Sequence, residues 1–198
     1  QNYVDSDGTI IWNRSENNPF NFNVTGIGRD DALALNQKQS KTNNTNDDIT
    51  IGIKYISSTN SLNTATFFAD KTFLMWGNDN GSLSPSTQIT KDFSSGINNL
   101  TSHVNATPIA RKWKLVVKDS VPTIKLSIPK SMVASTNSSN EEQYMMIIAD
   151  DETFTTNVTS ATMEATNTEV VVDFYIEGTK YITFGSTQEV KKARAVTF

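Results

Sequence analysis

The sequence contains no cysteine and only one histidine, and these two shortages remove several kinds of chemistry. Without cysteine the chain forms neither disulfides nor thiolate metal sites. A site built from several histidines is excluded, and a Ser-His-Asp arrangement would depend on His103 alone, with no Gly-x-Ser-x-Gly motif beside it. We therefore expect no catalytic residue, and we expect His103 to lie at the surface.

Long apolar runs are also missing. No run approaches the roughly 20 residues that span a bilayer as a helix, so no membrane insertion is expected. The start, Gln1-Asn2-Tyr3-Val4, is polar and uncharged, unlike a signal peptide. A single β domain reaches 198 residues without splitting. We expect residues 1–198 to be one module, excised from a larger multidomain protein.

Charge is balanced rather than concentrated. The formal net charge is -4, and the lysines are spread along the chain without a dense basic stripe. This argues against nucleic acid as a partner. A small basic cluster at Lys191, Lys192 and Arg194 is expected to be a solvated strand near the end of the chain.

Asparagine, serine and threonine are abundant, and together with alternating apolar residues they predict β-structure. Threonine favours strands, whereas asparagine and serine favour turns. Residues 49–55, 109–117 and 124–128 alternate between apolar and polar side chains, as half-buried strands do. Residues 73–76, 144–148 and 170–174 are apolar on both faces, which is typical of central strands.

Turn signals complete this picture. Asp119-Ser120 and Glu177-Gly178 are expected to close hairpins between their flanking strands. Residues 31–38 are compatible with either a short helix or an extended strand. Residues 40–48 and 134–140 are expected to be long polar loops. The predicted fold is an all-β, antiparallel β-sandwich with long polar loops and little helix.

Three residues are expected to have structural roles. Trp76 and Trp113 lie in strongly apolar strands and are predicted to be core residues. Arg111 shares a strand face with Trp113, which predicts partial burial, and a buried guanidinium needs a carboxylate or several carbonyl groups. We expect Arg111 to be an internal brace that reaches Asp30 or Asp31.

Calcium is the one inorganic ligand that the sequence suggests, because hard cations take clustered oxygen ligands. The candidate ligands are Asp5, Asp7, Asp30 and Asp31, with further candidates at Asp47-Asp48, Asp79 and Asp150-Asp151. None of these matches a twelve-residue loop with a terminal glutamate. The alternative is that the acidic side chains bond to the backbone of their own turns.

Other ligand sites are not indicated. Two carboxylates could face one another as in a glycosidase, but Trp12, Trp76 and Trp113 lie in apolar runs and are expected to pack in the core rather than stack on sugars. Gly26-Ile27-Gly28 is followed by Arg29 and acidic residues, not by the third glycine and helix of a phosphate cradle. We expect no organic cofactor.

Several motifs together resemble an uncharacterised β domain of large exported surface proteins of the Bacteroidota. The most specific one covers residues 26–31, Gly-Ile-Gly-Arg-Asp-Asp, followed by residues 35–41, Leu-Asn-Gln-Lys-Gln-Ser-Lys. Weaker matches occur at residues 5–12, 49–52, 70–77, 110–114 and 181–185. The resemblance covers most of the chain and implies no catalytic or ligand-binding residue.

The resemblance implies a secreted protein exported by the type IX route, similar in organisation to gliding-motility and cell-adhesion proteins. We therefore expect a non-catalytic, extracellular module of a bacterial cell-surface adhesin, which provides spacing and structure and recognises a surface or ligand. Its expected partners are neighbouring domains of the same protein and surface glycans or proteins. The alternative is a carbohydrate-binding module attached to a secreted enzyme or adhesin, and a hydrolase ranks third.

Overall fold

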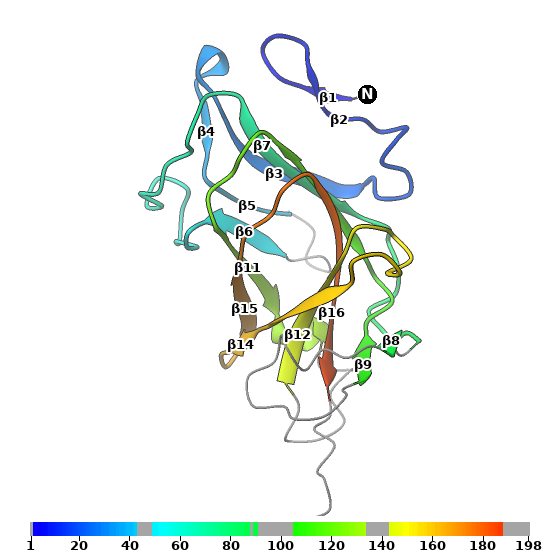
Figure 1. Ribbon diagram of the computed structural model, residues 1–198. Helices are drawn as coiled ribbons and strands as arrows, with labels where there is room; N and C mark the ends of the chain where they lie inside the picture. The colour runs from blue at the N-terminus through cyan, green and yellow to red at the C-terminus, as the bar shows by residue number, and fades with distance from the viewer. Residues whose placement is uncertain (1, 43–48, 88, 91–104, 134–142, 188–198) are drawn as a thin grey trace, which may run out of the picture.

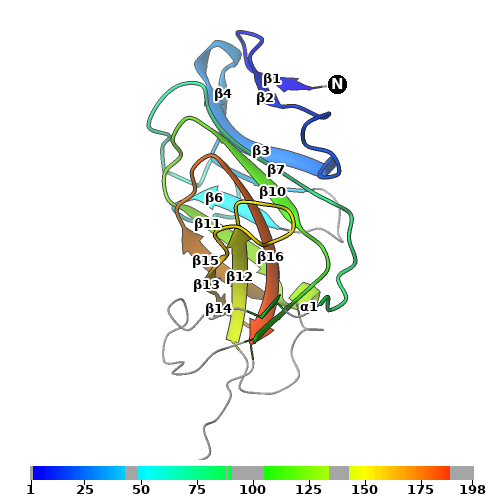
Figure 2. The ribbon, with the colours of Figure 1, turned by 45° about the vertical axis from the view of Figure 1, so that its right-hand side comes forward.

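The computed structural model describes residues 2–42, 49–87, 89–90, 105–133 and 143–187, and its main feature is two antiparallel sheets (Figures 1 and 2). The larger sheet contains, in spatial order, β13 (Thr159–Thr162), β12 (Gln143–Ala149), β16 (Thr179–Thr187), β10 (Trp113–Lys118), β7 (Thr72–Asn78), β3 (Phe22–Asp30) and β4 (Leu35–Gln37). To this sheet, β9 (Asn105–Pro108) adds beside β16, and β8 (Ile89–Thr90) pairs with β9.

The smaller sheet has the order β14 (Glu164–Ala165), β15 (Glu169–Phe174), β11 (Ile124–Pro129), β6 (Thr50–Ile53) and β5 (Gln39–Lys41). A separate hairpin pairs β1 (Tyr3–Val4) with β2 (Ile10–Trp12). Helical structure among the described residues is limited to η1 (Asp31–Leu33) and α1 (Lys130–Val133). The predicted all-β, antiparallel sandwich with little helix is confirmed.

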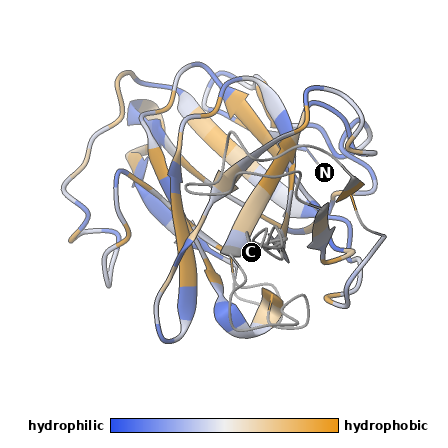
Figure 3. Cartoon of the chain, turned by 60° about the horizontal axis from the view of Figure 1, so that its bottom comes forward, coloured by the Kyte–Doolittle hydropathy of each residue, from blue (hydrophilic) through white to orange (hydrophobic). Residues whose placement is uncertain are grey.

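The core lies between the two sheets. Ile49, Ile51 and Ile53 from the smaller sheet face apolar side chains of the larger one, and in Figure 3 the hydrophobic colour lies mostly on the strands. Trp76 and Trp113 are fully buried in this core, as their strands predicted. The ring of Trp113 packs edge-on against Phe184, with 5.2 Å between the ring centroids.

Both lateral edges of the sandwich are spanned by chain that steps from one sheet to the other. Only Lys38 separates β4 in the larger sheet from β5 in the smaller one, and only Met163 separates β13 from β14. Residues 31–38, which the sequence left open between helix and strand, form η1 and then β4.

The two predicted hairpins are wrong. Asp119-Ser120 connects β10 to β11, and Glu177-Gly178 lies between β15 and β16, yet each pair of strands belongs to different sheets. Both connections therefore cross the sandwich, and Gly178 O in the second one accepts a hydrogen bond from Val117 N–H of β10 at 2.9 Å. Alternation identifies a strand, but it carries no information about which strand lies beside it.

The three strands that were apolar on both faces are internal, as predicted. β7 lies between β3 and β10, β12 between β13 and β16, and β15 between β11 and β14. The two long polar loops fall mainly on residues 43–48 and 134–142, which lie outside the described residues. No helix in the described part of the chain is long and apolar enough to cross a membrane.

The β1–β2 hairpin and the loop after it form a third layer on the outer face of the larger sheet, at the upper end of the molecule in Figure 1. Trp12 and Phe20 pack there against Met75 in a cluster separate from the main core. Trp12 is buried, and its indole Nε1–H donates to Asn21 Oδ1 at 3.0 Å. This layer covers only part of the sheet, and beside it the outer face remains open.

Candidate functional site

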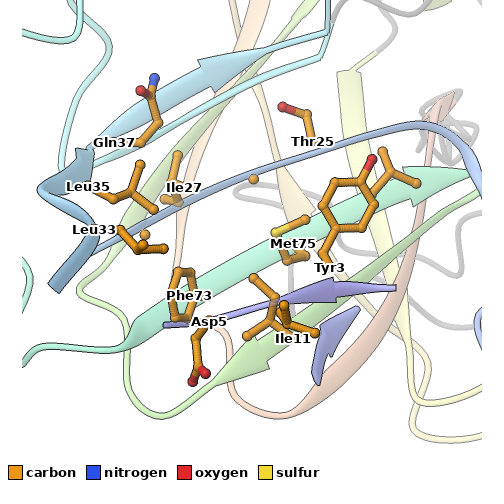
Figure 4. A pocket seen from close by; sticks show the side chains of 14 residues that line it. Tyr3, Asp5, Ile11, Thr25, Ile27, Leu33, Leu35, Gln37, Phe73 and Met75 are labelled. Carbon is orange, nitrogen blue, oxygen red and sulfur yellow. The ribbon is translucent and has the colours of Figure 1, made fainter. Parts of the chain in front are cut away.

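An apolar groove of about 360 Å³ lies on the outer face of the larger sheet, between the β1–β2 hairpin and β4. One wall comes from the N-terminal hairpin, with Tyr3, Val4, Asp5 and Ile11. The opposite wall comes from η1 and β4, with Leu33, Leu35 and Gln37. Figure 4 shows Phe73 and Met75 of β7 between these walls, while Thr25 and Ile27 project from the other side of β3.

Two glycines on β3 allow the floor of the groove to form. A Cβ atom at Gly26 would lie 2.3 Å from Met75 Sδ, and one at Gly28 would lie 2.3 Å from the ring of Phe73. The side chains of β7 therefore lean across β3 where β3 has no side chains. Because Phe73 and Met75 occupy this space, they present an apolar surface to the groove.

The hairpin wall is held in place by charged and polar contacts. Asp5 pairs with Lys118 of β10, and Asp7 pairs with Lys71 just before β7. The Ser6 N–H donates to Asp30 Oδ2 at 2.8 Å. These contacts join the turn after β1 to β10, to β3 and to the residue just before β7.

The electrostatics of this attachment favour charged carboxylates. The ammonium of Lys118 lowers the pKa of Asp5, against the opposing effect of burial, and the Thr9 and Asp7 N–H groups lower it further. Burial of Asp30 acts to raise its pKa, but hydrogen bonds from Ser6 and Leu33 and the charge of Lys71 together outweigh this effect and leave the pKa below its ordinary value. Asp5 also accepts bonds from Asp7 N–H and Thr9 N–H at 3.0 and 2.9 Å.

A further ion pair lies where β3 ends and η1 begins. Arg29 binds Asp31 in a bidentate manner, with Nε–Oδ1 and Nη2–Oδ2 distances of 2.8 and 2.7 Å. This pair raises the pKa of Arg29 and lowers that of Asp31. The Asp31 N–H donates to the exposed Asp70 at 2.8 Å, which connects η1 to the chain before β7.

The predicted brace between Arg111 and Asp30 or Asp31 is wrong. Arg111 is buried, as expected, but its Nε donates to Gly81 O at 2.7 Å. The position explains the difference, because Trp113 pairs with Asn78 at one end of β7 and Arg29 pairs with Thr72 at the other. Six residues of strand, roughly 20 Å, separate those ends. Arg29 is the arginine that binds the acidic turn.

The structure gives each of the four calcium candidates Asp5, Asp7, Asp30 and Asp31 a protein partner, as described above. Asp79 Oδ1 accepts bonds from Gly81 N–H and Lys112 N–H, and Asp150 pairs with Lys180. Within the described residues, no group of three or more histidine, aspartate or glutamate side chains could hold a metal ion. Asp47-Asp48, His103 and the basic cluster at Lys191, Lys192 and Arg194 lie outside the described residues.

A second, more polar cleft of about 480 Å³ lies at the opposite end of the larger sheet. It is lined by Ser86, Thr87, Thr153 and Thr183, with Lys112 and Phe154 beside them. Lys112 Nζ donates to Glu152 O at 2.8 Å and lies 5.7 Å from the centroid of the Phe154 ring. Phe154 itself is buried, so its face is not an open platform.

Sequence reasoning missed the groove. Its walls come from short strands and from η1, where Leu33 and Leu35 were part of a segment whose structure was left open. The signal that could have found it is the pair Gly26 and Gly28, since glycine in a strand marks a close approach by another group. The two glycines were interpreted as part of a family motif and not as a sign of a surface groove.

Comparison with known proteins gives one match. Residues 1–184 match the family described as Domain of unknown function (DUF8202). No curated protein and no solved structure matches the chain. The matched region includes every residue that lines the groove and all of the two sheets except the last three residues of β16, and residues 185–198 lie beyond it.

Proposed function

We propose that this chain, which belongs to the family described as Domain of unknown function (DUF8202), is a non-catalytic recognition module of an extracellular bacterial surface adhesin. The sandwich provides spacing and structure within the parent protein, and the groove is the surface that recognises a partner. The resemblance to exported Bacteroidota proteins supports the location at the cell surface and export by the type IX route.

The observation that carries this proposal is the gathering of exposed apolar side chains at the groove. Nine large hydrophobic residues are exposed in the described part of the chain, and four of them, Tyr3, Val4, Leu33 and Leu35, line the groove. Single exposed apolar residues are ordinary, whereas a contiguous patch indicates an interaction site. Ile10, the cross-strand partner of Val4, extends the patch.

The acidic side chains around the groove support a binding role rather than acid–base chemistry. The carboxylates accept hydrogen bonds from N–H groups and pair with nearby cations. These contacts keep the pKa values of Asp5, Asp30 and Asp31 low. A general acid at neutral pH needs the opposite shift. These carboxylates hold the walls together.

A carbohydrate-binding module attached to a secreted enzyme or adhesin is the second candidate. The polar cleft favours it, because Ser86, Thr87 and Lys112 are among the polar residues that line it. The buried state of Trp12, Trp76 and Trp113 weighs against it, since none of them offers a stacking face. Binding to a soluble glycan that is abolished by Lys112→Ala but not by Leu33→Asp would favour this candidate.

A pair of leucine variants tests the leading proposal. Leu33 and Leu62 are exposed to nearly the same extent, 59% and 60%, but only Leu33 lines the groove. Cells of a non-adherent bacterium that display the chain should adhere to the surface on which the bacterium that produces this protein grows. Leu33→Asp should reduce this adhesion about tenfold. Leu62→Asp should leave it unchanged. Equal loss in both variants, or no gain in adhesion with the unmodified chain, would reject the groove as the recognition surface.

A further inference from the structure

Residues 2–21, which we call the strap, form the outer layer of the fold and are bonded mainly to one another. β1 and β2 pair only with each other, as a sheet of their own. In the loop that follows, Asn17 N–H donates to Asn13 O at 2.9 Å, and Asn21 Nδ2 donates to Arg14 O at 2.8 Å. The strap therefore keeps its shape without joining the backbone ladder of the larger sheet.

Side chains hold the strap on the outer face of the larger sheet. Trp12 and Phe20 cover Met75, and Phe20 packs edge-on against Tyr181 with 5.3 Å between the ring centroids. The polar anchors are those of the turn after β1, to Lys118, Lys71 and Asp30. The strands beneath are instead joined by continuous backbone pairing, as between β7 and β10. Contacts of the first kind can open locally while the ladders stay intact.

Gly77 of β7 lies directly under the strap. A Cβ atom at this position would lie 2.2 Å from Phe20 O and 3.3 Å from Trp12 Cζ2. Glycine in a strand permits this close approach of another backbone. Its neighbours Trp76 and Asn78 are buried. A methyl group at Gly77 would therefore push against the strap and leave the inner face of β7 as it is.

Lys114, the cross-strand partner of Gly77, is also covered by the strap and is only 9% exposed. Its Nζ donates to Glu16 O of the strap at 3.4 Å and lies 5.5 Å from the centroid of the Tyr181 ring. Burial lowers the pKa of Lys114, against the attraction of Glu152 and Glu16. Burying a charge is unfavourable unless it is well paired. The seated strap thus opposes the hydration of this ammonium group, and release of the strap restores it.

We propose that the strap is a releasable wall of the groove: it leaves the larger sheet as one unit while the sandwich stays folded, and the groove exists only while the strap is seated. The strap residues that line the groove are Tyr3, Val4, Asp5 and Ile11. Release removes all four together and leaves the opposite wall on η1 and β4. A partner that touches both walls holds the strap down, because the coupling between binding and seating is reciprocal. The control of recognition rests on the proposed function, whereas the release itself does not.

An introduced thiol measures the release, because the chain contains no cysteine. Met75→Cys places the thiol beneath the strap, and the adjacent Leu74→Cys places it in the core between the sheets. Without denaturant, a bulky maleimide dye should react about tenfold faster with Met75→Cys, because local opening precedes global unfolding. Low concentrations of urea should scarcely change that rate, since release exposes little surface, but should raise the rate for Leu74→Cys steeply. Equal rates with the same dependence on urea would overturn the proposal.

Two further changes in the Met75→Cys chain separate release from direct access through the groove. Gly77→Ala should raise the labelling rate about tenfold, because the added methyl group displaces the strap. Lys114→Met should lower it severalfold, because the covered side chain no longer carries a charge. Phe68→Ala, at a position that is 69% exposed, is the control and should leave the rate unchanged. Access through the groove without release would respond to none of these changes. A rate indifferent to Gly77→Ala, or raised by Lys114→Met, overturns the proposal.

Adhesion of displaying cells then tests whether the strap controls recognition. Neither Gly77 nor Lys114 lines the groove, yet Gly77→Ala should weaken adhesion and Lys114→Met should strengthen it. Adhesion that is lost with Leu33→Asp but indifferent to both strap variants would overturn the control by the strap and keep the groove as the recognition surface. Labelling rates that follow the expectation, with adhesion indifferent even to Leu33→Asp, would confirm the release and reject the proposed function.

Discussion

At the scale of single residues, the polar side chains that dominate the composition bond to the backbone of loops. The carboxylate of Asp151 accepts hydrogen bonds from Thr153, Thr155 and Thr156. The bond from Thr153 is the largest contribution, and it holds the pKa of Asp151 well below its ordinary range despite the opposing effect of burial. Asn63 acts similarly, with its amide donating to Ile53 O and Tyr55 O. Loops of this chain are thus ordered by their own side chains.

The pairing of Asp5 with Lys118 predicts a dependence of stability on acidity. The pKa of Asp5 is lowered in the folded state, so its stabilising contribution is complete above the unfolded value of 3.8. The contribution is lost as the pH falls below that value through the lower pKa of the folded state. We expect the unmodified chain to lose stability between about pH 4 and pH 2. Asp5→Asn should lose less over the same interval, as measured by urea unfolding at each pH.

Other residues share this acid dependence, so the Asp5 variant should flatten the profile without removing it. The pKa values of Asp30, Asp31, Asp150 and Asp151 are also lowered. Asp119→Asn, at an exposed position on the β10–β11 connection, is the matched control. Identical acid profiles for Asp5→Asn and the unmodified chain would show that the Lys118 pair does not stabilise the fold.

Trp113 is expected to be one of the most sensitive positions of the core. It is fully buried and contacts Phe184 edge-on, so Trp113→Ala removes a large side chain that its neighbours only partly replace. The free energy of unfolding should fall by about 3–5 kcal/mol, as measured by chemical denaturation. The control is Phe68→Ala, because Phe68 is 69% exposed. A similar cost in both variants would contradict the assignment of Trp113 to the core.

At the scale of elements, the short strands β4 and β5 depend on one side chain from another part of the chain. Asn60 Oδ1 accepts from Lys38 N–H at 2.6 Å and from Gln39 N–H at 3.3 Å, and its Nδ2 donates to Asn36 O at 2.9 Å. These bonds occupy backbone groups at the place where the chain steps between the sheets. Asn60 therefore both holds the step and covers a strand edge.

Replacement of Asn60 by alanine should lower the stability of the fold considerably, although the side chain is small. Backbone groups that lose their partners each carry a penalty, and we expect Asn60→Ala to lower the free energy of unfolding by about 1–3 kcal/mol. The exposed edge should also increase aggregation on heating, as measured by light scattering. Ser61→Ala, at the next and exposed position, is the control. Unchanged stability of Asn60→Ala would show that water replaces these bonds at little cost.

The wrongly predicted hairpins also belong to the element scale. β10 and β11 are separated by a short connection that carries the turn residues of a hairpin, yet β10 pairs with β7 and β16, while β11 pairs with β6 and β15. Each strand has a buried face, and both faces meet in the core between the sheets. A connection that crosses the sandwich buries the apolar faces of both strands as well as a hairpin does. Local patterning therefore cannot distinguish a crossing connection from a hairpin.

At the scale of the whole molecule, one core joins the two sheets. Side chains from β6, β11 and β15 pack with side chains from β7, β10, β12 and β16 in one continuous cluster. We expect the sheets to unfold together, with the same urea midpoint by far-ultraviolet circular dichroism and by tryptophan fluorescence. Two separated midpoints would show that the sheets, or the separate Trp12 cluster, are independent units.

Local sequence patterns were sufficient to predict the class of the fold, the internal strands and the burial of Trp76 and Trp113. Those properties follow from local periodicity and apolar content, which act over a few neighbouring residues. The partner of Arg111 and the paths of the two connections depended on which strands lie side by side. The order of strands is set by the packing of distant segments, and period-two alternation is the same for every order.

The groove, by contrast, depends on how distant segments pack together. Its walls belong to the N-terminal hairpin and to β4, and its floor to β3 and β7, so its lining residues span the sequence from Tyr3 to Met75. Gly26 and Gly28 were visible as glycines, but their consequence depends on the side chains of Phe73 and Met75 across the strand pair. A surface of this kind exists only after the sheet has formed, because no single segment contains more than one of its sides.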